Sequence, residues 1–344
     1  MLRRIFIWGL RSGTNCLHHS FPAHGPARPG LDLCALEFVV RFIQADLLDR
    51  LAPHSYANTF TRCRLLRVIG DAMYELDQYL DDQLSRGRCY FSKKEALEAH
   101  GYTPEAFTAA ATRLIKKNRL AIPYRGFYLV LRPEDRVAGA PEPVRWIDPL
   151  MKYLKLDYRV SLLRAAAFHG ASHQAAMVFQ VVVPKQLRGI DIGRHRIQFV
   201  YQATDVFREA NQAEFLQQMK SDTGFAKVAG VELMLLDSIR YFHKAGGING
   251  VAQIVHDTGN KADPRRLAKV SVLYENSTVR RLGYLLDRFD HGRQSKVLEP
   301  FARKAKSMKA LDPSVKPIIE GMPEFAERDS KWMLLINEEV EIDV

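Results

Sequence analysis

The feature that most constrains the fold of this chain is the order of structural signals in residues 86–132. Residues 92–100 and 104–117 have the apolar spacing and the start signals of two helices, with a glycine turn between them. Residues 120–124 and 127–131 are β-prone runs on either side of an Arg-Gly pair, which is typical of a hairpin. Together with an amphipathic helix just before them, these signals predict a winged helix-turn-helix.

Each predicted helix begins with its own capping signal. Ser92 and Glu95 form a capping-box pattern, in which two side chains accept hydrogen bonds from backbone N–H groups that the helix leaves free. Thr103 precedes Pro104, and Pro is favoured at the first helical position because an N–H group is not needed there. Gly101 fits the left-handed turn that ends many helices. The second helix places its apolar residues on one face, toward a core: Phe107, Ala110, Ala111, Leu114 and Ile115.

The same segment is strongly basic, with ten Lys and Arg residues against three acidic residues. Such an excess on a small module is what a phosphate-contacting surface requires. In a helix-turn-helix the second helix enters the major groove, so we expect Thr108, Thr112 and Arg113 to read bases. We expect contacts with phosphate groups, the backbone or the minor groove from the flanking residues Ser92, Lys93, Lys94, Lys116, Lys117, Arg119, Tyr124 and Arg125. The alternative for this module is docking to another protein.

The rest of the chain divides into three further segments. At 344 residues it is long enough for two or three domains. Residues 1–72 begin with a stretch free of acidic residues, and only 32–52 has helical spacing. We expect 1–72 to be a poorly structured or partly helical extension with Met73 as the natural start, the alternative being an authentic basic arm. The expected order is therefore this extension, the winged helix-turn-helix at 73–132, a Pro/Gly-rich linker at 133–143 and a larger domain at 144–344.

The larger segment mixes helix and strand signals, which predicts an α+β domain rich in helices. The predicted strands are 178–183, 196–201, 225–229 and a final strand in the tail after Lys331. The predicted helices are 154–168, 231–244, 248–256, 264–274, 278–288 and 299–309. Basic groups suggest a second electropositive surface for DNA or an acidic partner, although each alone is typical of a solvated helix face. These groups are Lys261, Arg265, Arg266 and Lys269, then Arg280 and Arg281, then Arg303, Lys304, Lys306 and Lys309.

Catalysis, metal binding and membrane insertion find little support in the sequence. It has no phosphate-binding G-x-x-x-x-G-K-S/T loop, no G-x-S-x-G elbow and no H-E-x-x-H helix. His169 and His173 have metal-ligand spacing, but no acid or Cys in the neighbouring turns completes a site. The four Cys are widely spaced, which fits a reducing cytoplasm, and no apolar run approaches the roughly 20 residues of a membrane span. We therefore expect a cytoplasmic, nucleoid-associated protein that is not an enzyme and holds no cofactor or metal.

Several phrases of the sequence, taken in order, resemble a known family. They are the wing RGFYLV, SLLRAAAFHGASHQA followed by FQVVVP, KVAGVELMLLDSIRYF, and VRRLGYLLD. From residue 73 onward the chain resembles the AbiEi-type antitoxins and related regulators of bacterial abortive-infection operons. The resemblance implies a winged helix that binds promoter repeats and represses its own operon, and a C-terminal domain that counteracts a nucleotidyltransferase-like toxin encoded beside it. It also implies DNA binding by the basic residues Lys93, Lys94, Arg113, Lys116, Lys117 and Arg125.

The basic module and the resemblance together predict a DNA-binding transcriptional repressor, the antitoxin of a type IV, AbiE-like toxin–antitoxin system. Its partners would be double-stranded DNA and a toxin, with or without a stable protein complex. One alternative is a stand-alone regulator whose C-terminal domain senses a ligand or mediates oligomerisation; a neighbouring toxin-like gene would argue against it. The other is a nucleic-acid enzyme in which scattered acids such as Asp205, Glu232 and Asp237 converge around Mg²⁺.

Overall fold

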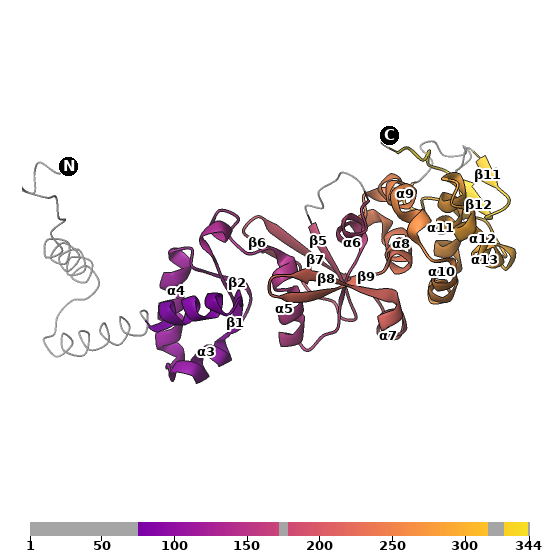
Figure 1. The fold of residues 1–344 in the computed structure, drawn as a ribbon. Helices are drawn as coiled ribbons and strands as arrows, with labels where there is room; N and C mark the ends of the chain where they lie inside the picture. The colour runs from indigo at the N-terminus through magenta and orange to yellow at the C-terminus, as the bar shows by residue number, and fades with distance from the viewer. Residues whose placement is uncertain (1–74, 172–177, 316–326, 343–344) are drawn as a thin grey trace, which may run out of the picture. The chain divides into compact units, whose positions relative to one another are not determined.

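A computed structural model of the chain, drawn in Figure 1, describes three stretches: residues 75–171, 178–315 and 327–342. The chain divides into a unit of residues 1–62 and a unit of residues 63–344, and every described residue belongs to the second. The predicted extension 1–72, Met73 and His173 lie outside the described residues. The described part mixes helices and sheets, which confirms the predicted α+β class.

Residues 75–132 form a small module with the element order of a winged helix-turn-helix. Its elements are the helical residues 75–85, β1 (Tyr90–Ser92), α3 (Lys93–His100), α4 (Pro104–Lys116), β2 (Leu120–Tyr124) and β3 (Phe127–Val130). The strands form one antiparallel sheet in the order β1-β3-β2, in which Phe91 lies opposite Tyr128. The β2–β3 hairpin follows α4 along the chain at the position expected for a wing.

The predicted capping residues fix where α3 and α4 begin. The Ser92 hydroxyl accepts a hydrogen bond from the Glu95 N–H at 3.2 Å, and the Glu95 carboxylate accepts one from the Ser92 N–H at 2.7 Å. Gly101 ends α3 in the left-handed conformation (φ 63°), which a residue with a side chain adopts only with strain. Thr103 caps α4 by accepting a hydrogen bond from the Ala106 N–H at 3.2 Å. The turn between the helices therefore has the chemistry that the sequence predicts.

The module has a hydrophobic core of its own. The residues that α4 contributes are those that its apolar spacing predicts: Phe107, Ala110, Ala111 and Leu114, with Ile115 half-buried at the edge. The Phe91 and Tyr128 rings stack with their centroids 5.3 Å apart, and Phe107 meets the Tyr128 ring edge-on at 5.3 Å. Because this face of α4 is buried, its opposite face is left to solvent.

The larger part of the described chain is built on a six-stranded sheet. Its strands are β4 (Arg159–Val160), β5 (Val178–Val183), β6 (Ile190–Ile192), β7 (His195–Tyr201), β8 (Leu216–Ser221) and β9 (Gly224–Ala229). They lie in the order β6-β7-β5-β4-β9-β8, with β5 parallel to β7, β4 parallel to β9 and the other pairs antiparallel. β5 is buried along almost its whole length, so the centre of the sheet lies in the hydrophobic core.

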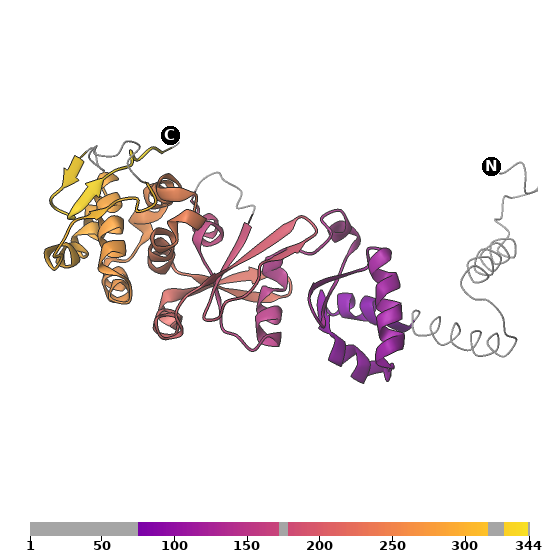
Figure 2. The same cartoon turned by 180° about the vertical axis from the view of Figure 1, so that it is seen from behind.

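Helices pack against this sheet and continue beyond it. They are α5 (Ile147–Tyr153), α6 (Leu162–Phe168), α7 (Thr204–Ala210), α8 (Val231–Arg240), α9 (Gly247–Thr258), α10 (Pro264–Ser271), α11 (Asn276–Arg288), α12 (Gly292–Lys296) and α13 (Glu299–Arg303). In α8 every residue from Val231 to Ile239 is buried, because the helix packs against α6, α9, α10 and α11. Figures 1 and 2 show α8 to α13 gathered on one side of the sheet. A small second sheet, in the order β10-β12-β11, is formed by β10 (Lys309–Ala310), β11 (Glu327–Asp329) and β12 (Leu334–Ile336).

A fully buried ion pair joins β4 to α8. The Arg159 Nε and Nη2 atoms each lie 2.9 Å from an oxygen of Asp237. The same carboxylate accepts hydrogen bonds from the hydroxyls of Ser161 and Tyr274, both at 2.7 Å. Arg159 also donates to the Gln202 side chain at 2.7 Å. Each Asp237 oxygen therefore has two donors, which compensates for the loss of water around a buried carboxylate.

The predicted helix 154–168 is wrong in its first half. Lys155 has a left-handed backbone (φ 56°), and the chain then forms β4. Arg159 and Val160 pair with Val182 and Val181 of β5, so the apolar spacing of this stretch is satisfied by a sheet. The helix α6 occupies only the second half of the predicted range.

The predicted helix 299–309 is wrong beyond its first turn. α13 ends at Arg303, and Lys309 and Ala310 pair with β12 as the strand β10. The final strand predicted in the tail is present as the short β12. The strands β6 and β8 and the helix α7 are additions to the prediction. β8 lies at a sheet edge with polar, largely exposed side chains, so it lacks the alternation that marks a strand.

Residues 133–143, expected to be a linker, form an ordered connection that packs against the larger sheet. The Ala138 carbonyl accepts a hydrogen bond from the Arg194 N–H at 2.7 Å. At the start of this segment, the Asp135 carboxylate lies 3.3 Å from the Arg145 guanidinium, and both side chains are largely buried. The connection is therefore held by specific contacts along its length.

Candidate nucleic-acid interface

The exposed face of α4 and Lys93 of α3 border a shallow, wide-open hollow of about 690 Å³, which we call the α4 groove. It is lined by Lys93 from α3 and, from α4, by Pro104, Glu105, Thr108, Ala109, Thr112, Arg113 and Lys116. The structure thus brings together all three predicted base-reading residues and two of the predicted phosphate-contacting lysines. This follows from the helical repeat, since residues three, four and seven positions apart share one face of α4.

The hydroxyl groups of the two threonines in this groove donate hydrogen bonds to backbone carbonyls of α4. Thr108 Oγ1 donates to the Pro104 carbonyl at 2.6 Å, and Thr112 Oγ1 donates to the Thr108 carbonyl at 2.7 Å. To a bound molecule these side chains therefore offer a methyl group and an oxygen lone pair rather than a hydrogen-bond donor.

Lys93 connects the two helices of the predicted helix-turn-helix. Its ammonium group lies 3.2 Å from Thr108 Oγ1 and 3.5 Å from the Pro104 carbonyl oxygen, at the first turn of α4. The same group lies 5.6 Å from the centre of the Phe107 ring. Lys93 thus positions Thr108 and places one positive charge at the N-terminal end of the groove.

Several cations of the module have no acidic partner in the part of the chain that the structure describes. Among the described residues, no Asp or Glu pairs with Arg113, Lys116, Lys117 or Arg125. Lys94 has only a loose pair with Glu98 at 3.7 Å, and its side chain is 83% exposed. The four unpaired cations can bind an anion directly. Lys94 can also do so, because an exposed ion pair such as Lys94–Glu98 contributes little free energy.

Arg119 differs from the other predicted phosphate-contacting residues. Its guanidinium lies 3.4 Å from Asp77 and 2.5 Å from Asp81, and only 20% of its side chain is exposed. It therefore fastens the helical residues 75–85 to the start of β2. Ser92 is likewise occupied by its capping hydrogen bond, so its role at a phosphate is limited to its place at the start of α3.

The tip of the wing contacts α5. The Tyr153 hydroxyl donates a hydrogen bond to the Arg125 carbonyl at 3.1 Å. Gly126 turns the hairpin with φ 78°, and a Cβ there would lie 2.7 Å from the Tyr153 oxygen. The side chains of Tyr124 and Arg125 remain exposed. The hairpin tip is thus held by its backbone and by the Tyr124 ring, which meets the Tyr153 ring edge-on at 6.5 Å, while Arg125 faces solvent.

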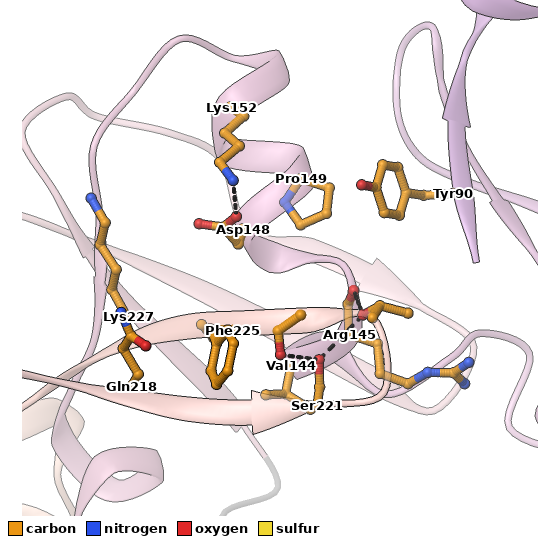
Figure 3. A pocket seen from close by; sticks show the side chains of 13 residues that line it. Tyr90, Val144, Arg145, Asp148, Pro149, Lys152, Gln218, Ser221, Phe225 and Lys227 are labelled. Atoms are coloured by element: carbon orange, nitrogen blue, oxygen red, sulfur yellow. Dashed lines mark hydrogen bonds and ion pairs between the residues drawn. The ribbon is translucent and has the colours of Figure 1, made fainter. Parts of the chain in front are cut away.

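A second hollow, of about 400 Å³, lies between β1, α5 and the β8–β9 hairpin (Figure 3). One ion pair lies within the hollow: Lys152 binds Asp148 at 2.6 Å, and this hydrogen bond raises the pKa of Lys152. The other two lining cations bind acids outside it, Arg145 with Asp135 and Lys227 with Asp157. In Figure 3 the Arg145 guanidinium points away from the hollow. Aromatic surface is provided by Tyr90 and by Phe225, which is exposed.

The second electropositive surface predicted from the sequence loses several of its positive charges, which are buried or paired with acids in the structure. Arg280 is 3% exposed and donates to the Met333 carbonyl at 2.7 Å, and Arg281 donates to the Ala310 carbonyl at 3.0 Å. Burial lowers the pKa of both guanidinium groups. Lys269 binds Glu214 at 2.6 Å. The two arginines therefore hold the second small sheet in place and belong to the interior.

The groups considered for metal or catalytic chemistry are separated in the structure. Asp237 is held by Arg159, Glu232 accepts a hydrogen bond from the Asp263 N–H at 2.6 Å, and Asp205 pairs with Arg208 at 3.3 Å. No cluster of three or more His, Cys, Asp or Glu side chains able to hold a metal ion occurs in the described part of the chain.

His169 has a structural contact of its own. Its Nε2 lies 2.7 Å from the Ala229 carbonyl, and burial lowers the pKa of its imidazole. This contact fits the structural role expected for His169. In residues 75–171, 178–315 and 327–342, no helix has the length and apolar character needed to cross a lipid bilayer.

In the described residues, a small basic module with a hydrophobic core of its own precedes a six-stranded sheet that is packed against helices. Residues 159–288 match the AbiEi antitoxin C-terminal domain, which confirms over this stretch the resemblance predicted from the sequence. The match supports an antitoxin role, which is regulatory rather than catalytic, and it implies a toxin partner.

A solved structure has a similar fold. The crystal structure of the RV2827C protein from Mycobacterium tuberculosis aligns with a TM-score of 0.50 and 12% sequence identity, over 75% of this chain and 90% of that chain. At this identity the likeness concerns the fold alone. No curated protein matches the chain.

Proposed function

We propose that this chain is a DNA-binding transcriptional repressor and the antitoxin of a type IV, AbiE-like toxin–antitoxin system. The observation that carries the DNA-binding part is the groove on α4, whose exposed face is bordered by cations without acidic partners. A major groove about 12 Å wide admits one α-helix, and the 13 residues of α4 extend over roughly 20 Å.

In this mechanism the residues of the module have two kinds of role. Thr108, Thr112 and Arg113 contact base edges in the major groove. Phosphate groups are neutralised by the flanking cations Lys93, Lys94, Lys116, Lys117 and Arg125. Each neutralised phosphate releases condensed counterions, so binding weakens as salt rises. Occupancy of the promoter then blocks transcription of the operon.

The antitoxin part rests on the larger domain. Residues 159–288 match the AbiEi antitoxin C-terminal domain, and their core is continuous with the six-stranded sheet. We propose that this domain counteracts a nucleotidyltransferase-like toxin encoded next to it. Cells that express the toxin should grow again when this chain is co-expressed. Growth inhibition that persists in the presence of this chain would refute the antitoxin role.

A gel-shift assay against the DNA upstream of the gene, repeated at several salt concentrations, tests the DNA-binding role. Five phosphate contacts predict a slope of about −4.5 in a plot of log K against log salt concentration. Lys116→Ala should reduce the slope by about 1 and weaken all sequences alike. Lys185→Ala is the matched control, because Lys185 is exposed outside the module. Equal effects of both variants would contradict the assignment of the α4 face.

A second candidate is a stand-alone regulator whose larger domain senses a small molecule. The hollow beside Tyr90 and Phe225 favours it, because a ligand there would contact both the basic module and the β8–β9 hairpin. The genomic neighbourhood separates the two candidates. A toxin-like gene beside this one supports the antitoxin, and its absence supports the sensor.

A further inference from the structure

The α4 groove contains one residue that a purely phosphate-binding surface would not have. Glu105 lies in the groove, in the first turn of α4, and it is exposed. Among the described residues, no Lys, Arg or His pairs with its carboxylate, although the groove also contains Lys93, Arg113 and Lys116. A free carboxylate repels the DNA backbone, so its presence at this place lowers non-specific affinity.

A carboxylate in the major groove has few partners. It accepts hydrogen bonds and cannot donate them, so it needs an exposed amino group on a base. Cytosine presents its N4 amino group there, beside a carbon-bound hydrogen. Adenine presents its N6 amino group beside the N7 acceptor, which repels a carboxylate. The favourable partner of Glu105 is therefore cytosine.

The other side chains of the groove complete a pattern. Arg113 is the groove residue best suited to the two acceptors of guanine, which a planar guanidinium binds at once. Thr108 and Thr112 have committed their hydroxyl hydrogens to backbone carbonyls and offer methyl groups, which favour contact with the methyl of thymine. Along α4, the groove thus presents a hydrogen-bond acceptor at Glu105, methyl groups at Thr108 and Thr112, and a hydrogen-bond donor at Arg113.

We propose that Glu105 is a specificity-determining residue that selects a cytosine in the operator, while Arg113 selects a guanine about three to four base pairs away. The spacing follows from the helix: eight residues at 1.5 Å each separate the two positions by roughly 12 Å along α4, and base pairs rise by about 3.4 Å. This inference rests on the proposed DNA-binding function and adds the base pairs that it recognises.

A structural role for Glu105 has to be separated from this one. An acidic side chain in the first turn also stabilises a helix through the helix dipole. Glu105→Gln weakens that effect but introduces an amide, which binds the N6 and N7 atoms of adenine in a bidentate manner. A structural role predicts lower stability with the same preferred sequence, whereas a reading role predicts a different preferred base.

The test is a selection from random double-stranded DNA with the full chain, followed by titration of the selected site and its single-base variants. Wild-type protein should enrich cytosine at one position and guanine three or four base pairs away, and a wrong base at either should weaken binding about 5- to 150-fold. Glu105→Gln should enrich adenine in place of that cytosine. Lys117→Gln, the matched control, should weaken all sites and keep the wild-type preference.

The outcomes separate this inference from the function on which it rests. If Glu105→Gln is folded by circular dichroism and selects the same base as wild type, the inference is wrong and the repressor proposal stands. If wild-type protein binds DNA with the expected salt dependence but enriches no sequence, the inference is also wrong. If wild-type protein binds no DNA at all, the proposed function itself fails.

Discussion

Replacing Asp237 with Ala probes the buried charge at the centre of the larger domain. Both side chains of the Arg159–Asp237 pair are fully buried, and two contacts of 2.9 Å join them. Burial alone would lower the pKa of Arg159, but Asp237 beside it raises that pKa above its usual range, so the arginine stays charged. Without the carboxylate, the guanidinium stays buried without a counter-ion, which costs about 3–5 kcal/mol of unfolding free energy. The hydroxyls of Ser161 and Tyr274 also lose their acceptor.

Two further variants separate the loss of charge from the loss of packing. Asp237→Asn keeps the shape of the side chain and removes its charge, so it should lose most of the same free energy. The double variant Arg159→Met/Asp237→Leu removes both charges and fills the space, and it should recover most of the loss, since buried pairs are often replaced by apolar side chains at little net cost. The comparison reports the penalty of an unpaired charge rather than the net value of the pair.

Urea denaturation followed by far-UV circular dichroism measures these differences at pH 7. The free energies are compared only between variants with the same m-value, which is the slope of the unfolding free energy against urea concentration. A different m-value would indicate a change in the unfolding transition itself. A loss below about 1 kcal/mol for Asp237→Ala would show that water reaches the arginine, contrary to its complete burial. A double variant no more stable than Asp237→Ala would also refute the reasoning.

Three further predictions concern stability and reactivity. Gly283→Ala would place a Cβ against the Trp332 ring, too close for a contact between carbon atoms, and should cost about 1–3 kcal/mol of unfolding free energy. Gly292→Ala, in open space, should change it by no more than about 0.5 kcal/mol, and thermal denaturation compares the two variants. Burial raises the pKa of the Cys89 thiol to about 11, so its peptide should resist alkylation at pH 8 until urea unfolds the protein, and rapid native labelling would contradict this. Burial lowers the pKa of His169, so the unfolded state takes up the extra proton and stability should fall as pH drops below about 6.5. His169→Gln should lose less stability than wild type between pH 7.5 and 5.5 in urea titrations.

The starts of α3 and α4 were predictable from the sequence because helix capping involves only residues within one turn of each other. Ser92 and Glu95 bond to each other's backbone within one turn, and Thr103 does the same for α4. A pattern of three or four residues therefore contains all the groups involved. The face of α4 was predictable for the same reason, since one helix carries every base-reading candidate.

The errors occur where distant residues decide the structure. Arg159 and Val160 form a strand because Val181, Val182 and Val228 lie beside them, and those partners are not visible in a window around residue 160. The charges of Arg280 and Arg281 fit a solvated helix face by spacing alone, yet carbonyl groups far along the chain accept their hydrogen bonds. Burial of a long cation depends on such partners and not on its own position in a helix.

The same reasoning changes the meaning of the positive charge of the basic module. Ten cations oppose three acids in residues 86–132, but Arg119 pairs with acids before this segment and Arg132 pairs with Asp222 beyond it. Arg88 is paired within the segment, with Glu95. These three cations are therefore committed to acidic partners, and a single module has only modest non-specific affinity at physiological salt. Under the proposed function, tight operator binding requires base contacts from α4. Two linked modules on repeated sites would bind more tightly still, because the second module binds at a high effective concentration.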